Sequence, residues 1–147
     1  MQMSTRGRYA VMALTDLAAE GDTGAGARAV PLASIAERQH ISQAYLEQLF
    51  ARLRRQGLVQ SVRGAGGGYR LARPAEELSV AEVVTAVDEP LKVTRCPEGR
   101  GGCMPGAALC RTHDLWAETG RRLRDYLAAV SLADVVAGRL GGGGSTP

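Results

Sequence analysis

The sequence predicts a mainly α-helical protein with one small β-hairpin. In several segments apolar residues recur at intervals of three and four, the pattern of a helix with one buried face. One stretch instead alternates apolar and polar residues on both sides of a glycine-rich turn, which is typical of a hairpin. The chain has 147 residues, of which 45% are apolar and 22% charged, enough for one compact domain or two small lobes.

The composition limits the classes of protein to consider. No apolar run approaches the ~18 residues that a membrane span needs, and the N-terminal segment lacks the apolar stretch of a secretory signal. We therefore expect a cytoplasmic protein that does not associate with membranes. Residues 1–73 carry ten arginines and five acidic residues, whereas residues 74–147 carry eight basic and ten acidic residues. A basic first half fits a nucleic-acid-binding part, although a solvated arginine-rich surface gives the same balance in many enzymes.

Two helices are predicted in the N-terminal part of the chain. The first ends near Glu20, and its buried face comprises Ala10, Ala13, Leu14, Leu17 and Ala18. A Gly- and Ala-rich loop over 22–30 follows it. A short second helix then begins after Pro31, with Leu32, Ile35 and Ala36 on one face.

The third predicted helix runs from about Gln43 to Arg55 and begins after Ser42, whose hydroxyl suits an N-cap. Its inward face consists of Leu46, Leu49, Phe50 and Leu53, and its outer faces are polar and basic. A short helix, a tight turn and a longer polar-faced helix form a helix-turn-helix, whose second helix enters the major groove of DNA. A helical hairpin with a solvated surface has the same parts, so this pattern alone leaves both interpretations open.

The segment L-V-Q-S-V-R-G-A-G-G-G-Y-R-L-A predicts two short strands around a glycine-rich turn. A hairpin directly after a recognition helix is the wing of a winged helix-turn-helix. Arg63 lies at its tip, where a guanidinium can enter the minor groove, and glycines such as Gly66 permit close approach to the phosphate backbone. A nucleotide-binding loop is disfavoured, because no Lys-Ser or Lys-Thr follows the glycines.

The second half predicts a linking helix, a cysteine-rich loop and a long helix. The linking helix ends at Pro90 and buries Val80, Val83, Val84 and Val87. The long helix carries an apolar stripe through Trp116, Gly120, Leu123, Leu127 and Val130. Packing of this stripe against a second copy of the chain gives a twofold dimer with recognition helices about 34 Å apart. The alternative is that the stripe packs only on the winged domain of its own chain. A short helix and a flexible glycine-rich tail follow.

Cys96, Cys103, Cys110 and His113 lie within eighteen residues, and the chain has no other cysteine. Thiolates and imidazole are ligands of iron-sulfur and zinc centres. We expect His113 at the start of the long helix, where the helix dipole favours the neutral ring that binds a metal. These residues leave open an iron-sulfur cluster and a structural Cys3His zinc site. They disfavour a metal-free thiol switch, because no C-x-x-C pair is present.

Several segments closely resemble the bacterial iron-sulfur cluster regulators of the IscR family. They are R-G-R-Y-A-V, I-S-Q-A-Y-L-E-Q-L-F-A-R-L-R-R-Q-G-L-V, S-V-R-G-A-G-G-G-Y, V-D-E-P and the Cys-Cys-Cys-His loop, and the resemblance covers roughly residues 3–140. It implies a homodimeric winged-helix repressor or activator, not an enzyme, that binds promoter DNA and controls genes of iron-sulfur cluster biogenesis.

The resemblance also implies the site residues. Cys96, Cys103, Cys110 and His113 would hold a [2Fe-2S] cluster that the iron-sulfur assembly machinery donates. The DNA-binding residues would be Ser42, Gln43, Glu47 and Gln48 on the recognition helix, with Arg63 and Gly66 in the wing.

Three positions depart from the family pattern. Each gap between cysteines has six residues instead of the usual five, and Ala44 occupies a position where the family carries a serine. Arg8 occupies the position of the aspartate ligand of the related nitric-oxide-sensing branch, which favours the histidine-ligated branch. An electron carrier with the same centre is the competing class, but electron transfer does not require a DNA-binding wing.

The expected organisation divides the chain into five parts. They are a winged helix-turn-helix domain (1–78), a linking helix (79–94), a cluster-binding loop (95–113), a dimerisation helix with a short C-terminal helix (114–140) and a flexible tail (141–147).

Overall fold

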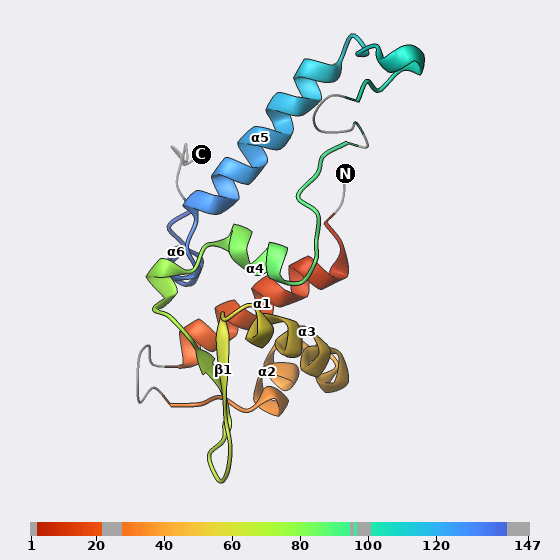
Figure 1. Ribbon diagram of the computed structural model, residues 1–147. Helices are drawn as coiled ribbons and strands as arrows, with labels where there is room; N and C mark the ends of the chain where they lie inside the picture. The colour runs from red at the N-terminus through yellow and green to blue at the C-terminus, as the bar shows by residue number, and fades with distance from the viewer. Residues whose placement is uncertain (1–2, 22–27, 95, 97–100, 141–147) are drawn as a thin grey trace.

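The computed structural model describes residues 3–21, 28–94, 96 and 101–140. The predicted tail, part of the loop over 22–30 and part of the cysteine-rich loop lie outside these residues. Within them, no helix combines the length and the hydrophobicity that a membrane crossing demands. Figure 1 shows a helical head with a hairpin at one end and a long helix that projects from the opposite end.

The head begins with three helices, α1 (Thr5–Glu20), α2 (Leu32–Gln39) and α3 (Gln43–Arg55), at the positions that the sequence predicts. The turn between α2 and α3 starts at His40, which adopts the left-handed conformation with φ 53°. An ion pair ties α1 to α2: Arg38 Nη2 lies 2.6 Å from Asp16 Oδ1, and Asp16 is 7% exposed. The side chain of Gln39 donates to the same carboxylate at 2.7 Å.

The predicted wing is formed by β1 (Val59–Val62) and β2 (Gly68–Leu71), which pair antiparallel with Val59 opposite Leu71. Val30 adds a short bridge to the free edge of β2, since its N–H donates to Tyr69 O at 2.8 Å and its carbonyl accepts from Tyr69 N at 2.9 Å. The hairpin is therefore held by the segment before α2 as well as by its own ladder.

One apolar core joins both ends of the described chain. α4 (Val80–Ala86) and the short C-terminal α6 (Leu132–Ala137) both contact α1. Leu132 of α6 is fully buried in the same core as Phe50 of α3, and the Phe50 ring packs edge-on against Tyr69 of the wing at 4.9 Å. Two short 3-10 turns, η1 (Ala75–Glu77) and η2 (Pro105–Ala107), complete the described elements.

Two predicted helix boundaries are wrong. α4 ends at Ala86 rather than at Pro90, because Asp88 turns into the left-handed region with φ 59°. The long helix α5 (His113–Ala129) stops before Val130, which is extended and accepts from Val80 N–H at 2.9 Å. This contact fixes the far end of α5 to the start of α4.

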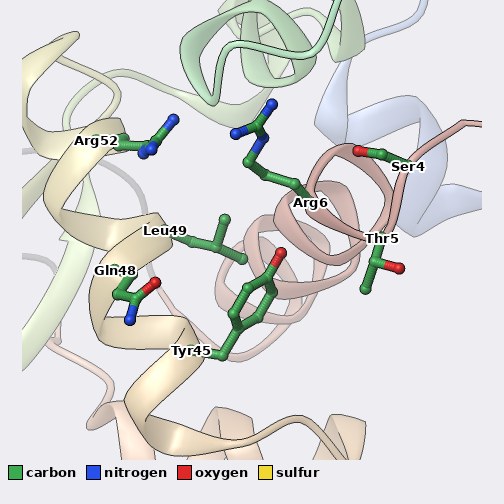
Figure 2. A pocket seen from close by; sticks show the side chains of 7 residues that line it. All are labelled: Ser4, Thr5, Arg6, Tyr45, Gln48, Leu49 and Arg52. Atoms are coloured by element: carbon green, nitrogen blue, oxygen red, sulfur yellow. The ribbon is translucent and has the colours of Figure 1, made fainter.

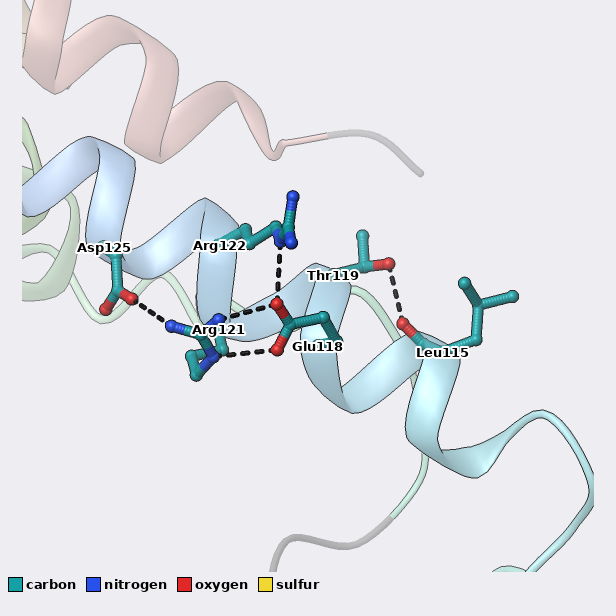
Figure 3. Close-up of polar contacts among 6 residues, drawn as sticks. All are labelled: Leu115, Glu118, Thr119, Arg121, Arg122 and Asp125. Carbon is teal, nitrogen blue, oxygen red and sulfur yellow. Dashed lines mark hydrogen bonds and ion pairs between the residues drawn. The ribbon is translucent and has the colours of Figure 1, made fainter.

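The exposed surface of α5 is rich in ion pairs (Figure 3). Glu118 accepts hydrogen bonds from Arg121 at 2.6 Å and from Arg122 at 2.7 Å, and Arg121 also pairs with Asp125 at 2.9 Å. The hydrogen bonds from Arg121 and then Arg122 lower the pKa of Glu118 to about 2. These contacts support a helix that the head covers only in part.

Candidate metal centre and nucleic-acid interface

The cysteine-rich loop brings three of the four predicted ligands together at the N-terminal end of α5. The ligand atoms of Cys96, Cys103 and His113 all lie within 4.8 Å of one another, and Cys103 Sγ is 3.8 Å from His113 Nδ1. All three side chains are half-buried. Two thiols and an imidazole that converge in this way can hold a metal ion or a metal cluster.

Cys110, the fourth predicted ligand, lies beside this group but outside it. Its backbone N–H donates to Cys103 Sγ at 3.0 Å, while its own Sγ is 3.6 Å from Thr112 Oγ1. Hydrogen bonds from the Cys103 thiol and then from Thr112 lower the pKa of the Cys110 thiol. For Cys103 the N–H of Cys110 favours the thiolate, but the Cys110 side chain and burial outweigh it and raise the pKa. The two sulfurs therefore interact, with the negative charge favoured on Cys110.

Backbone turns of the loop set this arrangement. The N–H of Met104 donates to Ala108 O at 3.0 Å across η2, and a Cβ on Gly102 would overlap the Ala107 carbonyl. The N–H of His113 donates to Cys110 O at 3.0 Å, so a single turn joins these two predicted ligands. His113 is the first residue of α5, as predicted.

Two threonines that the sequence analysis did not single out contact the cysteines. Thr94 Oγ1 accepts from the N–H of Cys96 at 2.8 Å, and Thr112 Oγ1 contacts Cys110 Sγ. Each threonine lies two residues from its cysteine, and this spacing in the sequence could have predicted the contact. A hydroxyl at that distance reaches back to the neighbouring backbone or side chain.

The predicted DNA-facing residues all lie on the surface of α3 and the wing. The structure places as exposed Ser42, Gln43, Glu47, Gln48, Arg63 and Gly66. Ser42 has a structural role in addition, because its hydroxyl accepts from Tyr45 N at 3.3 Å and caps α3. The side of α3 that carries the predicted base-reading residues is therefore free of the head's own core.

Comparison with known proteins identifies the family to which the chain belongs. The sequence profile of the Rrf2 family, described as iron-dependent transcriptional regulators, matches residues 3–138. The HTH-type transcriptional regulator IscR of Klebsiella pneumoniae (strain 342) is 50% identical over 136 residues, which span 92% of this chain and 80% of that protein.

Two solved structures show the same fold. T. potens IscR has a TM-score of 0.71 and 36% identity, with 95% of this chain and 88% of that chain covered. CymR, the global cysteine regulator of B. subtilis, has a TM-score of 0.75 and 29% identity, with 93% of this chain and 97% of that chain covered. The predictions of a winged-helix fold and of a transcriptional regulator rather than an enzyme are confirmed. The chain belongs to the Rrf2 family of transcriptional regulators.

Proposed function

We propose that this protein is a homodimeric regulator of iron-sulfur biogenesis genes whose binding to promoter DNA responds to the occupancy or redox state of a [2Fe-2S] cluster. The observation that carries the proposal is the convergence of Cys96, Cys103 and His113 within 4.8 Å at the start of α5. The similarity of the chain to IscR relatives supports iron-sulfur chemistry at these cysteines and this histidine.

The donor set fits such a cluster. Cys96, Cys103, Cys110 and His113 would hold it, with Cys110 adjoining the other three through its N–H contact to Cys103 Sγ. When bound, the cluster supplies one-electron redox chemistry whose potential a histidine ligand raises relative to thiolate alone. The protein itself keeps the His113 ring beside the sulfurs and leaves the group partly open to solvent.

The segment between α4 and the loop links the ligand group to the DNA-facing helix. Gly120 of α5 gives Val93 room, since a Cβ there would lie 3.1 Å from Val93 Cγ2. At the other end of the segment, the Asp88 carboxylate pairs with Arg52 of α3 at 2.7 Å. Ordering of the loop by a ligand therefore has a physical path to the recognition helix, through which it shifts the population of DNA-binding conformations.

The proposed partners follow from this function. They are double-stranded promoter DNA, a second copy of the chain and an iron-sulfur assembly system that donates the cluster. The proposed compartment is the cytoplasm, where thiols stay reduced.

Within the recognition helix, we propose that exposed Glu47 discriminates between operators. A carboxylate that faces acceptor groups on bases is repelled, so a change in its position changes site choice. Apo and holo forms of Glu47→Ala are expected to bind a panel of operators with more similar preferences than the two wild-type forms. Unchanged preferences in both forms of the variant would refute this role.

The direct test is an ultraviolet-visible spectrum of anaerobically purified protein with iron, sulfide and zinc analysis. We expect charge-transfer bands with equal amounts of iron and sulfide, and DNA binding that differs between holo and apo protein. His113→Ala is expected to lose most of the iron, whereas His40→Ala, which changes the other histidine of the chain, retains it. A colourless protein with stoichiometric zinc would make the site structural and would refute cluster control.

A further inference from the structure

A notch of about 390 Å³ lies between the first turn of α1 and one face of α3. Its walls include Arg6 of α1 and Tyr45, Gln48 and Arg52 of α3, with Leu49 between them. Figure 2 shows the two arginines reaching from opposite walls with their guanidinium groups turned toward the same end of the notch. Two guanidinium groups at one opening suit an anion that has several oxygen acceptors.

Asp88 draws the two arginines together. Its carboxylate pairs with Arg52 Nη1 at 2.7 Å, and its backbone carbonyl accepts from Arg6 Nη2 at 3.1 Å. Glu89, the neighbouring acid, instead accepts from the N–H of Ser4 at 3.0 Å and from the Ser4 hydroxyl. Arg52 thus meets the Asp88 carboxylate, Arg6 meets only the Asp88 backbone carbonyl, and the Glu89 carboxylate is engaged by Ser4 at the start of α1.

The guanidinium groups have unused donors. Each carries five N–H groups, of which the contacts to Asp88 use only a part. Arg6 Nε is buried and has no hydrogen-bond partner among the described residues. The Arg52 side chain remains 35% exposed. A buried donor without an acceptor is costly, so an acceptor that reaches the Arg6 guanidinium gains a favourable contact.

We propose that Arg6 and Arg52 form a phosphate-binding notch that grips the DNA backbone beside the recognition helix. The proposal rests on the proposed DNA-binding function and extends it to two residues outside the predicted base-reading set. Gln48, which belongs to that set, lines the same notch. A phosphate held there fixes the register of α3 in the major groove, since phosphate contacts position a recognition helix and base contacts read the sequence.

The alternative is that Arg52 serves only to anchor α3 to Asp88. The two roles differ in what Asp88→Asn does. A phosphate site keeps both arginines in that variant, so the slope of log K against log salt is retained even where loss of the Asp88–Arg52 pair changes the overall affinity. A purely structural ion pair is broken equally by Asp88→Asn and Arg52→Gln, so the two variants weaken binding alike.

The test measures how salt affects the affinity of the cluster-loaded protein for a random-sequence duplex by fluorescence anisotropy. Arg6→Gln and Arg52→Gln are each expected to reduce the slope of log K against log salt by about one per protomer, and the affinity about five- to tenfold near 0.1 M salt. Arg122→Gln on α5 removes the same charge from a side chain that is 77% exposed and is expected to leave the slope unchanged.

Thermal unfolding of each variant shows whether a loss of binding comes from misfolding. The proposed phosphate site is overturned if both arginine variants keep the wild-type slope. It is also overturned if Arg52→Gln and Asp88→Asn weaken binding equally without a change of slope. Either result leaves the proposed function intact. Absence of any salt-dependent DNA binding by the wild-type protein would overturn the proposed function and the notch with it.

Discussion

Gly68 illustrates how a single residue sets the attachment of the wing to the head. Its φ of 152° lies in a region that L side chains rarely adopt, and a Cβ at this position would overlap the Val30 carbonyl. That carbonyl accepts from Tyr69 N at 2.9 Å, so the strand edge and the segment before α2 are already in hydrogen-bond contact. The backbone there has no space for a side chain.

Gly68→Ala is therefore expected to destabilise the protein by roughly 3 kcal/mol or more, because strain and backbone overlap act together. Gly66→Ala is the matched control, since Gly66 has a φ of 73° but open space around it. It is expected to cost only about 1–2 kcal/mol. Chemical denaturation followed by circular dichroism measures both, and equal losses would show that the overlap is relieved by small shifts.

At the scale of the element, the recognition helix depends on a cap that also lies on the DNA-facing surface. The Ser42 hydroxyl accepts from Tyr45 N at 3.3 Å, which satisfies one of the unpaired N–H groups of the first turn. The buried face of α3 then packs into the core through Leu46, Leu49, Phe50 and Leu53. Substitution of Ser42 thus affects both the helix start and any contact with DNA.

Ser42→Ala is expected to cost about 1 kcal/mol of stability through loss of the cap. Ser42→Asp retains a capping oxygen and is expected to keep near wild-type stability, but it adds a negative charge that repels phosphate. Denaturation and DNA titration of both variants separate the two roles. If the DNA affinities of Ser42→Ala and Ser42→Asp change only in proportion to their stabilities, a contact between Ser42 and DNA is contradicted.

The linking helix α4 begins with a capping box that responds to pH. The N–H of Ser79 donates to Glu82, and Arg73 pairs with the same carboxylate at 2.7 Å; in that order these contacts lower the pKa of Glu82 below its ordinary 4.5. A lowered pKa means that the folded state favours the carboxylate. The stabilisation is therefore present above about pH 4.5 and is lost as the pH falls through the lowered pKa.

Arg73→Gln is expected to raise the pKa of Glu82 toward its ordinary value, although the backbone N–H of Ser79 still lowers it. An NMR titration of the Glu82 side-chain carboxyl measures the change. Arg139→Gln removes the ion pair to Asp134 in the equivalent box of α6 and is expected to leave the Glu82 pKa unchanged. A Glu82 titration that is the same in wild type and in Arg73→Gln would contradict this assignment.

At the scale of the whole molecule, α5 projects from the head (Figure 1). Among the described residues, some of its large apolar side chains are exposed. Leu115 is 57% exposed and Tyr126 is 46% exposed, and their spacing of eleven residues places them on one face of the helix. Gly120 and Leu127 on the neighbouring face are buried or half-buried. The predicted dimer stripe through Gly120 and Leu127 thus packs on the chain's own head, and we propose that a second copy covers Leu115 and Tyr126 instead.

Leu115→Glu is expected to weaken the proposed dimer at least tenfold, since a carboxylate in an apolar interface loses its hydration without gaining a partner. Ala117→Glu places the same charge on another, exposed face of α5 and is expected to leave the dimer intact. Analytical ultracentrifugation over a range of concentrations measures both. A wild-type protein that stays monomeric at all concentrations would contradict a dimer.

The sequence by itself determined the features that depend on local order. The periodicity of apolar residues and the cap at Ser42 predicted α1, α2 and α3, and the glycine-rich turn predicted the hairpin, because helix faces, caps and turns involve residues close in the chain. It also named the four candidate ligands, since three cysteines and a histidine in one segment are visible without a fold.

Only the tertiary structure decided which of these groups meet. It placed Cys103 beside His113 and Cys110 slightly apart, because the turn at Gly102 and η2 sets their separation within a glycine-rich loop. It also brought Arg6 and Arg52 to one notch, where Asp88 holds them. Contacts between residues far apart in the chain depend on how the elements pack, and no local pattern records that packing.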